Sequence, residues 1–187
     1  MRLGDLLDLD VLARHINAGY VTERLHETLP LRVLNYTPKA QFERMWDDVT
    51  RQCRGLIYRE GPHATSRVHV EQEVIARSWP KFFNYGEIVD DLRYENDVLD
   101  MTATGEVTDK MDGSLGILYP TDDGYAVATR GSFHSEQAEH ATAVWRERYS
   151  TFEPRPTWTY LFEIVYPENR IVVDYAGRDD LILLGTV

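Results

Sequence analysis

The sequence predicts an α+β fold with antiparallel sheets and a few flanking helices, and three observations support that class. Short segments rich in β-branched and aromatic residues, which are typical of strands, recur along the chain. Two of these segments flank a turn, as in an antiparallel hairpin. Helical patterns are restricted to three stretches, and hairpin-linked strands with few helices are typical of α+β domains. The length of 187 residues, with no repeat or Gly/Ser linker, indicates a single domain over residues 1–187.

The first predicted helix lies within residues 1–20, near the start of the chain. Asp8 or Asp10 is a candidate N-cap, because a short acidic side chain can accept hydrogen bonds from the first free backbone N–H groups. Gly19 is a candidate stop signal. Another helix is predicted over about 135–148, where two glutamates lie near its positive N-terminal end.

A further helix is predicted after Thr37, which is a candidate N-cap, with Pro38 in the first turn. Four apolar residues follow at i, i+3, i+4 and i+7, the spacing that places side chains on one face of a helix. These residues are Phe42, Met45, Trp46 and Val49. We expect this stripe to face the core.

The remaining patterned segments predict strands. Their composition is β-branched and aromatic, and one pair flanks the turn Pro120–Gly124. The predicted strands cover residues 53–58, 67–75, 114–119, 125–130, 158–165, 170–175 and 181–187. Because the chain stops inside the last apolar run, we expect the domain to be C-terminally incomplete.

The charge of the chain excludes a general polyanion binder. Acids outnumber bases, 31 to 20, so the net charge is −11 and any nucleic-acid contact needs a local basic site. Residues 51–81 hold six bases and three acids, whereas residues 82–123 hold two bases and eleven acids. The single Cys53 excludes an intramolecular disulfide and a Cys-based zinc site, which fits a cytoplasmic protein. The start of the sequence does not resemble a signal peptide, and no apolar run reaches the length of about 20 residues needed to span a bilayer, so no contact with a membrane is predicted.

Lys110 is the candidate nucleophile, because it begins the tetrad Lys-Met-Asp-Gly ahead of an apolar segment. A lysine becomes nucleophilic when burial or neighbouring cations favour its neutral amine. Asp112 adds an opposite charge, and Gly113 permits close backbone approach to a ligand. Taken alone, the tetrad is more typical of a surface turn than of a reactive lysine.

Two cationic side chains upstream are candidate phosphate ligands. Arg54 heads a predicted strand, where its guanidinium presents a fixed fork to phosphate oxygens. A solvated surface arginine is the alternative. Lys81 lies between Pro80 and two phenylalanines, where low dielectric strengthens its attraction for a triphosphate. Its alternative is a lysine that extends from the edge of the core into solvent.

Two further candidates lie downstream of the tetrad. Arg130 ends the second strand of the predicted hairpin, so we expect it to return towards Lys110 and to bind phosphate. A solvated strand-end arginine is the alternative. Glu163 lies inside an apolar run, where a carboxylate needs a partner. It pairs either with a basic residue in the core or with ribose hydroxyls or a metal-bound water.

The order of five motifs carries a family resemblance. They are Cys-Arg-Gly, Lys-Phe-Phe-Asn, Lys-x-Asp-Gly-Ser-Leu, Gly-Ser-x-x-Ser-Glu-Gln-Ala, and Phe-Glu-x-Val followed by Asn-Arg-Ile-Val. With these motifs in this order, the sequence resembles the ATP-dependent RNA ligases of the T-even bacteriophage type, and the match covers nearly everything from about residue 31 to residue 187. That family belongs to the covalent nucleotidyltransferase superfamily. The resemblance implies an ATP-grasp-like ligase adenylation domain.

The resemblance also implies roles for the central tetrad. Lys110 corresponds to the lysine that attacks the α-phosphate of ATP and forms a lysyl-AMP phosphoramidate. Asp112 corresponds to a carboxylate beside the nucleotide and a magnesium-bound water, and Gly113 corresponds to the glycine that admits the ligand. Glu163 matches the carboxylate near the ribose.

For the cationic residues, the resemblance implies contacts with phosphate. Arg54 and Lys81 match phosphate ligands of the family, and Tyr36 is expected to join them. Arg130 stands where the phage type has a lysine, so a fork replaces a point charge. A later glutamate and a final pair of lysines, which this superfamily uses for the metal and the α-phosphate, have no counterparts before Val187. We therefore expect weak adenylation, or none, from these 187 residues.

The function implied is RNA sealing with ATP and Mg²⁺. AMP passes from Lys110 to an RNA 5′-phosphate, and a 3′-hydroxyl then displaces it, as in RNA repair. RNA ends are the expected partners, and a monomer is the expected state. One alternative is a non-catalytic module that binds nucleotides or RNA ends. Another is a nucleotidyltransferase that acts on DNA ends or carries out cap-like guanylylation.

Overall fold

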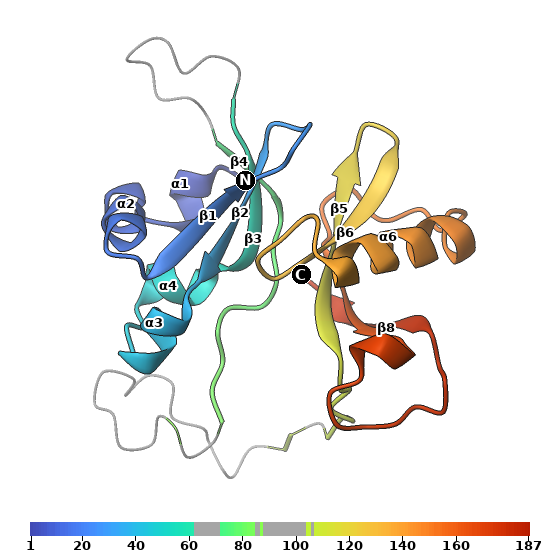
Figure 1. Cartoon of the computed structure of the whole chain (residues 1–187). Helices are drawn as coiled ribbons and strands as arrows, with labels where there is room; N and C mark the ends of the chain where they lie inside the picture. The colour runs from blue at the N-terminus through green and yellow to red at the C-terminus, as the bar shows by residue number, and fades with distance from the viewer. Residues whose placement is uncertain (62–71, 85–86, 88–103, 106) are drawn as a thin grey trace.

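The computed structural model describes residues 1–61, 72–84, 87, 104–105 and 107–187. Figure 1 shows two groups of strands side by side, with helices on their outer faces. The first sheet has the order β1-β2-β3-β4, and the second has the order β6-β5-β7-β8. Neighbouring strands in both sheets are antiparallel. The α+β class predicted from the sequence is therefore confirmed.

The first sheet is built from the N-terminal part of the chain. Its strands are β1 (Val21–Leu25), β2 (Leu31–Tyr36), β3 (Arg54–Arg59) and β4 (Glu73–Ala76). Strand β3 confirms the prediction for residues 53–58, whereas β1 and β2 were not predicted. Of the strand predicted over 67–75, residues 67–71 lie outside the described residues. In the described part, β4 begins at Glu73.

The second sheet contains most of the predicted strands. Its strands are β5 (Ser114–Thr121), β6 (Gly124–Thr129), β7 (Tyr160–Val165) and β8 (Asp180–Thr186). The predicted hairpin is confirmed, because Thr121 pairs with Gly124 across a tight turn. The strand predicted over 170–175 is wrong: these residues form an irregular loop between β7 and β8. Two of the backbone N–H groups in this loop donate to a side chain instead of to a neighbouring strand.

Short helices cover the outer face of the first sheet. They are α1 (Leu3–Leu6), α2 (Leu9–Asn17), α3 (Pro38–Phe42) and α4 (Asp48–Gln52). Asp8 caps α2 by accepting the N–H groups of Asp10 and Val11, and Gly19 follows the helix with φ = 76°. The structure thus selects Asp8, not Asp10, as the N-cap.

The single helix predicted after Thr37 is wrong, although Thr37 does cap α3. The helix ends after Phe42, and Arg44 adopts a left-handed φ of 52°. A new helix, α4, then begins behind its own N-cap, Asp47. As a result Phe42 is 90% exposed, while Trp46 is buried, so the predicted stripe does not share one face.

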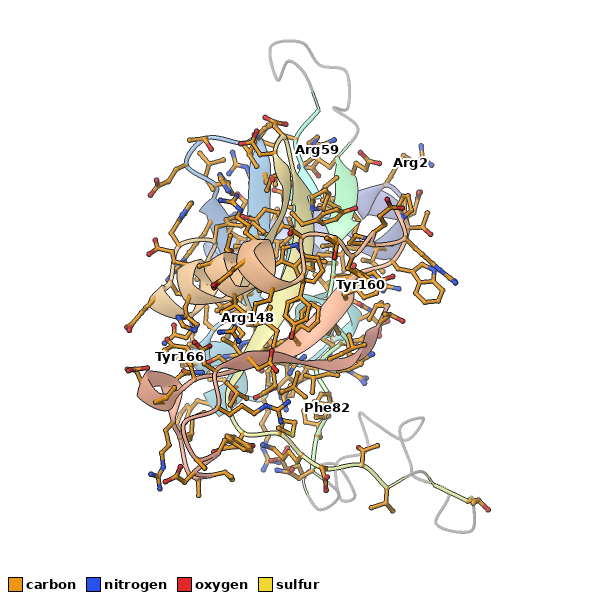
Figure 2. The ribbon with its side chains drawn as sticks, turned by 90° about the vertical axis from the view of Figure 1, so that its right-hand side faces the viewer. Arg2, Arg59, Phe82, Arg148, Tyr160 and Tyr166 are labelled. Carbon is orange, nitrogen blue, oxygen red and sulfur yellow. The ribbon has the colours of Figure 1, made fainter. Side chains whose placement is uncertain are left out.

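The long helix α6 (Glu136–Arg148) covers the outer face of the second sheet, and Figure 2 shows it in front of that sheet, above β8. Its N-cap is Ser135, which confirms the predicted start. The residues buried between the two sheets come from both halves of the chain. They are Leu31, Val33, Ile57, Ala76, Ile117, Tyr119, Ala126, Ala128, Phe133 and Leu161. The layers are therefore helix, sheet, sheet and helix.

Among the described residues, none of the helices has the length and apolar character needed to cross a bilayer.

Candidate active site

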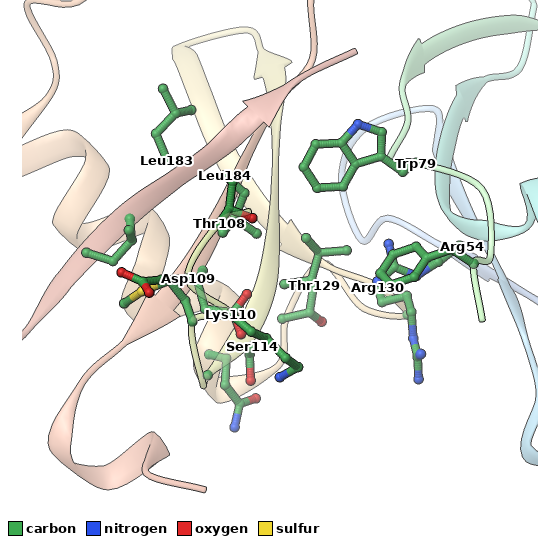
Figure 3. Close-up of a pocket in the computed structure, with 18 of the residues that line it drawn as sticks. Arg54, Trp79, Thr108, Asp109, Lys110, Ser114, Thr129, Arg130, Leu183 and Leu184 are labelled. Carbon is green, nitrogen blue, oxygen red and sulfur yellow. The ribbon is translucent and has the colours of Figure 1, made fainter. Parts of the chain in front are cut away.

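A pocket of about 1000 Å³ lies where the second sheet meets the end of β2, the start of β3 and the segment that follows β4. Five of the eight residues predicted for the site line it, and three do not. The predicted residues in the lining are Arg54, Lys110, Gly113, Arg130 and Glu163. Figure 3 shows Arg54 and Arg130 on one side of the pocket, with Asp109, Leu183 and Leu184 on the other. Side chains that are far apart in the sequence thus share one cavity.

The cationic side of the pocket is held by Arg54, at the start of β3. Its guanidinium lies 5.1 Å from the ring centroid of Phe82 and donates to the Ser78 hydroxyl at 3.4 Å. Ser78 in turn donates to the Arg54 carbonyl. Burial lowers the pKa of Arg54, and the charge of Arg130 lowers it further. The two guanidiniums therefore act on each other and favour an anion between them.

Gly55 explains how the two arginines come together. It has φ = 78°, a conformation that side-chain-bearing residues rarely adopt. A Cβ at this position would lie 2.2 Å from Cδ1 of Ile117 and 3.2 Å from the Arg130 Cα. Only glycine allows β3 to approach the end of β6 this closely.

Tyr36 lies behind Arg130 and does not line the pocket. Its hydroxyl accepts a 2.8 Å hydrogen bond from Nη1 of Arg130, whose guanidinium lies 4.8 Å from the centre of the Tyr36 ring. The ring also makes an edge contact with Trp46 at 4.9 Å. Tyr36 therefore orients a pocket arginine, whereas the sequence analysis expected a direct contact with the nucleotide.

Lys81 extends the cationic cluster behind the lining residues. Its Nζ donates to the Phe82 carbonyl at 2.5 Å and lies 4.3 Å from the ring centroid of Phe83. Burial lowers the pKa of Lys81, Glu87 opposes this effect, and the charges of Arg54, Arg130 and Arg51 add to the lowering. The expected aromatic surroundings are present.

Lys110 lines the pocket from an irregular segment that leads into β5. In Figure 3 its side chain extends towards the side that holds the arginines. The residue is exposed, so of the two effects that favour a neutral amine, burial does not act on Lys110. Its charge is close enough to lower the pKa of both Asp112 and Glu163.

Glu163 lies on β7, opposite Leu115 of β5, and reaches the pocket. Burial raises its pKa, whereas a hydrogen bond from the Gly113 N–H and the charges of Lys110 and Arg54 lower it. Gly113 has a steric role here, since a Cβ would lie 2.4 Å from the Ile164 carbonyl oxygen. The glycine lets the start of β5 lie against β7.

Asp112 was predicted for the site, but it does not line the pocket. Its Oδ2 accepts hydrogen bonds from the N–H groups of Val172 and Val173, at 2.7 and 2.8 Å. These two bonds lower its pKa. The carboxylate borders a smaller cavity formed by the loop after β7.

Sequence reasoning missed several residues that shape the site. Trp79 lines the pocket, and its ring lies 2.9 Å from the position of a Cβ on Gly185 of β8, so it connects the two sides. Tyr175 accepts the Asp112 N–H at 2.8 Å. Trp79 lay next to a recognised motif, but nothing in the sequence connected Tyr175 with Asp112.

The carboxylates that line the pocket suit a magnesium ion that arrives bound to the phosphates of a substrate. Among the described residues, they do not make up a metal site formed by the protein alone. In the part of the chain that the structure describes, no group of three or more His, Cys, Asp or Glu side chains could hold a metal. The pocket offers Asp109 and Glu163. Mg²⁺ commonly binds one or two carboxylates together with phosphate oxygens and water, so the donor set fits.

Comparison with known proteins supports one family. Residues 52–187 match a family model described as RNA ligase. A protein named RNA ligase from Rhodothermus phage RM378 is 26% identical over 167 residues, covering 71% of this chain and 36% of the relative. A provisionally named bifunctional polynucleotide kinase/RNA ligase from Autographa californica nuclear polyhedrosis virus is 27% identical over 176 residues, covering 83% of this chain and 24% of the relative. The chain thus spans less than half the length of either relative.

Proposed function

Since the chain belongs to the T4-type RNA ligase family, we propose that it is the adenylation domain of an ATP-dependent RNA ligase. Residues 1–187 form one nucleotidyltransferase domain in this proposal, and Lys110 is the residue that accepts AMP. The observation that carries it is the convergence of Lys110, Arg54, Arg130 and Glu163 on one pocket. These residues come from four separate parts of the chain.

The pocket suits a nucleotide in both size and polarity. Its volume of about 1000 Å³ is at the upper end of the range for small-molecule sites. Arg54 and Arg130 supply forked donors for phosphate oxygens, and Lys81 adds charge behind them. Trp79 and Leu184 supply apolar surface for a base. Glu163 is placed to accept hydrogen bonds from ribose hydroxyls.

In the proposed reaction, Nζ of Lys110 attacks the α-phosphorus of ATP as a neutral amine. A nitrogen–phosphorus bond forms, the bond to the bridging oxygen breaks, and pyrophosphate leaves with its electron pair. The amine loses one proton to solvent. Mg²⁺ supplies charge neutralisation for the phosphates when it is bound.

Two further transfers complete the proposed sealing. An oxygen of an RNA 5′-phosphate attacks the phosphorus of lysyl-AMP, and the Lys110 amine leaves after it takes up a proton. The 3′-hydroxyl then attacks the activated 5′-phosphorus, loses its proton, and releases AMP. Arg54 and Arg130 stabilise the charge that develops on the phosphoryl oxygens in each step.

The test is intact mass spectrometry after incubation with ATP and Mg²⁺. We expect an AMP adduct on the full-length ligase and none on its Lys110→Ala variant, whereas residues 1–187 alone should form the adduct weakly or not at all. The chain contains three lysines, Lys39, Lys81 and Lys110, so Lys39→Ala and Lys81→Ala complete the mapping. An adduct that persists on Lys110→Ala would show that the nucleophile is wrong. GTP in place of ATP, and DNA ends in place of RNA ends, test the substrate class.

A second candidate is a nucleotide-binding module without catalysis. The exposure of Lys110 favours it, since the burial that would favour a neutral amine is absent. Calorimetry distinguishes the two functions. ATP binding without any covalent adduct would select the module, whereas binding followed by Lys110-dependent adduct formation selects the ligase.

A further inference from the structure

The carboxylate of Asp112 is engaged by a loop that lies outside the pocket. A single oxygen, Oδ2, accepts the N–H groups of both Val172 and Val173. The backbone N–H of Asp112 donates in turn to the hydroxyl of Tyr175 at 2.8 Å. Both the side chain and the main chain of Asp112 are therefore bonded to residues 172–175.

A neighbouring contact ties the same two segments together. The Ser114 hydroxyl donates to Oδ1 of Asn169 at 3.2 Å, and the Asn169 amide donates to the Ile164 carbonyl at 2.9 Å. The segment 112–114 is thus connected to the loop 169–175 at several points.

Apolar burial does little to hold this loop. Ile171, Val172 and Val173 are 62%, 74% and 43% exposed. The pair between Arg170 and Asp174, at 3.0 Å, is also exposed, and such pairs contribute little stability. The hydrogen bonds to Asp112 are therefore a large part of what fixes the loop, because bonds to a charged acceptor are stronger than neutral ones.

We propose that Asp112 is a positioning residue that fastens the segment carrying Lys110 to the loop 170–175. Lys110 lies two residues before Asp112 on an irregular segment, so anchoring Asp112 restricts where the lysine can reach. The consequence for catalysis rests on the proposed function of Lys110, whereas the fastening itself does not. The carboxylate is then not a ligand of the nucleotide or of a metal-bound water.

The two roles make different demands on the side chain. Fastening needs one acceptor oxygen, which asparagine retains, because both N–H groups are bonded to the same oxygen of Asp112. A direct electrostatic role needs the negative charge, which asparagine lacks. Asp112→Asn and Asp112→Ala therefore separate the two roles.

The first measurement is amide hydrogen exchange of peptides that contain residues 170–175, in protein without ATP. We expect exchange about tenfold faster in Asp112→Ala, and within about threefold of the unaltered protein in Asp112→Asn. Tyr175→Phe removes the acceptor of the Asp112 N–H and should accelerate exchange less than Asp112→Ala does. Glu168→Ala, an exposed acid in the same loop, is the matched control and should leave exchange unchanged.

The second measurement is the single-turnover rate of AMP adduct formation as a function of ATP concentration. We expect Asp112→Ala to lower the maximal rate about 10- to 100-fold with little change in the ATP concentration for half-maximal rate, since misplacement of a reacting group acts mainly on rate. Asp112→Asn should retain a rate within about threefold of the unaltered protein.

Two outcomes would overturn the proposal. One is loop exchange in Asp112→Ala that matches the unaltered protein. The other is an adduct rate in Asp112→Asn as low as in Asp112→Ala, which would show that the charge itself is needed. If no adduct forms on any variant of the full-length ligase, the ligase proposal fails, and the exchange measurement still decides whether Asp112 fastens the loop. If Asp112→Ala does not fold, Tyr175→Phe and Asp112→Asn still give both readouts.

Discussion

The hydroxyl of Tyr36 determines how Arg130 is presented to the pocket. One guanidinium nitrogen is bonded to it at 2.8 Å, and the ring beneath limits the remaining rotation of the arginine. The other guanidinium nitrogens stay available for an anion. A residue outside the pocket lining thus restricts a lining side chain before any ligand arrives, which reduces the entropy lost on binding.

Tyr36→Phe should weaken ATP binding without loss of the fold. The variant keeps the ring that packs on Trp46 but removes the acceptor for Arg130. Immobilising such a side chain on binding costs about 0.5–1.5 kcal/mol, so loss of this preorganisation should raise the dissociation constant by up to about tenfold, as measured by calorimetry. Thermal unfolding should change little. Unaltered affinity would show that the hydroxyl does not position Arg130.

His26 makes the stability of the fold depend on pH. The residue is 8% exposed, and its Nδ1 lies 3.2 Å from the N–H groups of Thr28 and Leu29, so it must be an unprotonated acceptor. Burial lowers its pKa from the ordinary 6.5, and the charge of nearby His134 lowers it further. Because the unfolded chain takes up this proton more readily, the stabilisation is complete above pH 6.5 and is lost as the pH falls through the lower folded pKa.

His26→Asn tests this dependence, because its amide oxygen can accept the same N–H groups and does not titrate. Urea unfolding at pH 8 and pH 5.5 should show a larger loss of stability for the unaltered protein than for the variant. Equal losses would assign the pH dependence to other groups.

At the scale of elements, Gly113 couples the start of β5 to the carboxylate on β7. An added methyl group would lie 2.4 Å from the Ile164 carbonyl oxygen and 3.2 Å from Cγ of Glu163. The carbonyl oxygen belongs to the backbone and cannot yield without a shift of β7, whereas the Glu163 side chain can move aside. The same residue thus supports the packing of two strands and the position of a pocket side chain.

We expect Gly113→Ala to lower the free energy of unfolding by about 1–3 kcal/mol, the usual cost of overpacking. Adduct formation should fall as well, because Glu163 is displaced. Gly105→Ala is the control. Gly105 precedes Lys110 by five residues, and nothing lies within 4 Å of its added Cβ. Denaturant titration of both variants checks the expectation, and equal stabilities would contradict it.

Local patterns predicted some elements correctly and misread others. The β5–β6 hairpin and α6 were predictable, because turn chemistry, capping and composition all lie within the segment itself. The loop 170–175 was misread as a strand, because Ile171, Val172 and Val173 favour that conformation by composition. Their donors are instead taken up by Asp112, some 60 residues earlier, a contact that no local pattern contains.

The break after Phe42 has a similar cause. The apolar spacing to Val49 suits a continuous helix, but Asp47 caps a new helix, and its carboxylate also lies 2.6 Å from His15 of α2. Capping and tertiary contact outweigh a modest periodicity. For the site, the order of motifs predicted eight residues, and five of them line one pocket. The indirect role of Tyr36 and the orientation of Asp112 depend on packing, so the sequence could not show them.

For the whole molecule, the pocket depends on how the two sheets pack. Arg54 belongs to the first sheet, whereas Lys110, Arg130 and Glu163 belong to or adjoin the second. Three cations of this acidic chain, Arg54, Lys110 and Arg130, line the pocket where the sheets meet. Any change in the spacing between the sheets therefore moves Arg54 relative to both Arg130 and the proposed nucleophile.

Ile117 lies at the centre of this packing. It is fully buried between the sheets, and its Cδ1 occupies the space that a Cβ on Gly55 would need. Truncation to alanine removes this contact and leaves a cavity beside Arg54. We expect Ile117→Ala to cost about 2–5 kcal/mol of unfolding free energy, whereas Leu25→Ala, at a site 58% exposed on β1, should cost far less.

Because the two sheets share this core, they should unfold together. Amide hydrogen exchange of the unaltered protein and of Ile117→Ala tests this expectation. Protection in β2 and β3 should fall by the same factor as protection in β5 and β7, since all four strands then report one global opening. Loss of protection confined to one sheet would show that the sheets open separately. The packing of the sheets would then not be what holds Arg54 near Arg130 and Lys110.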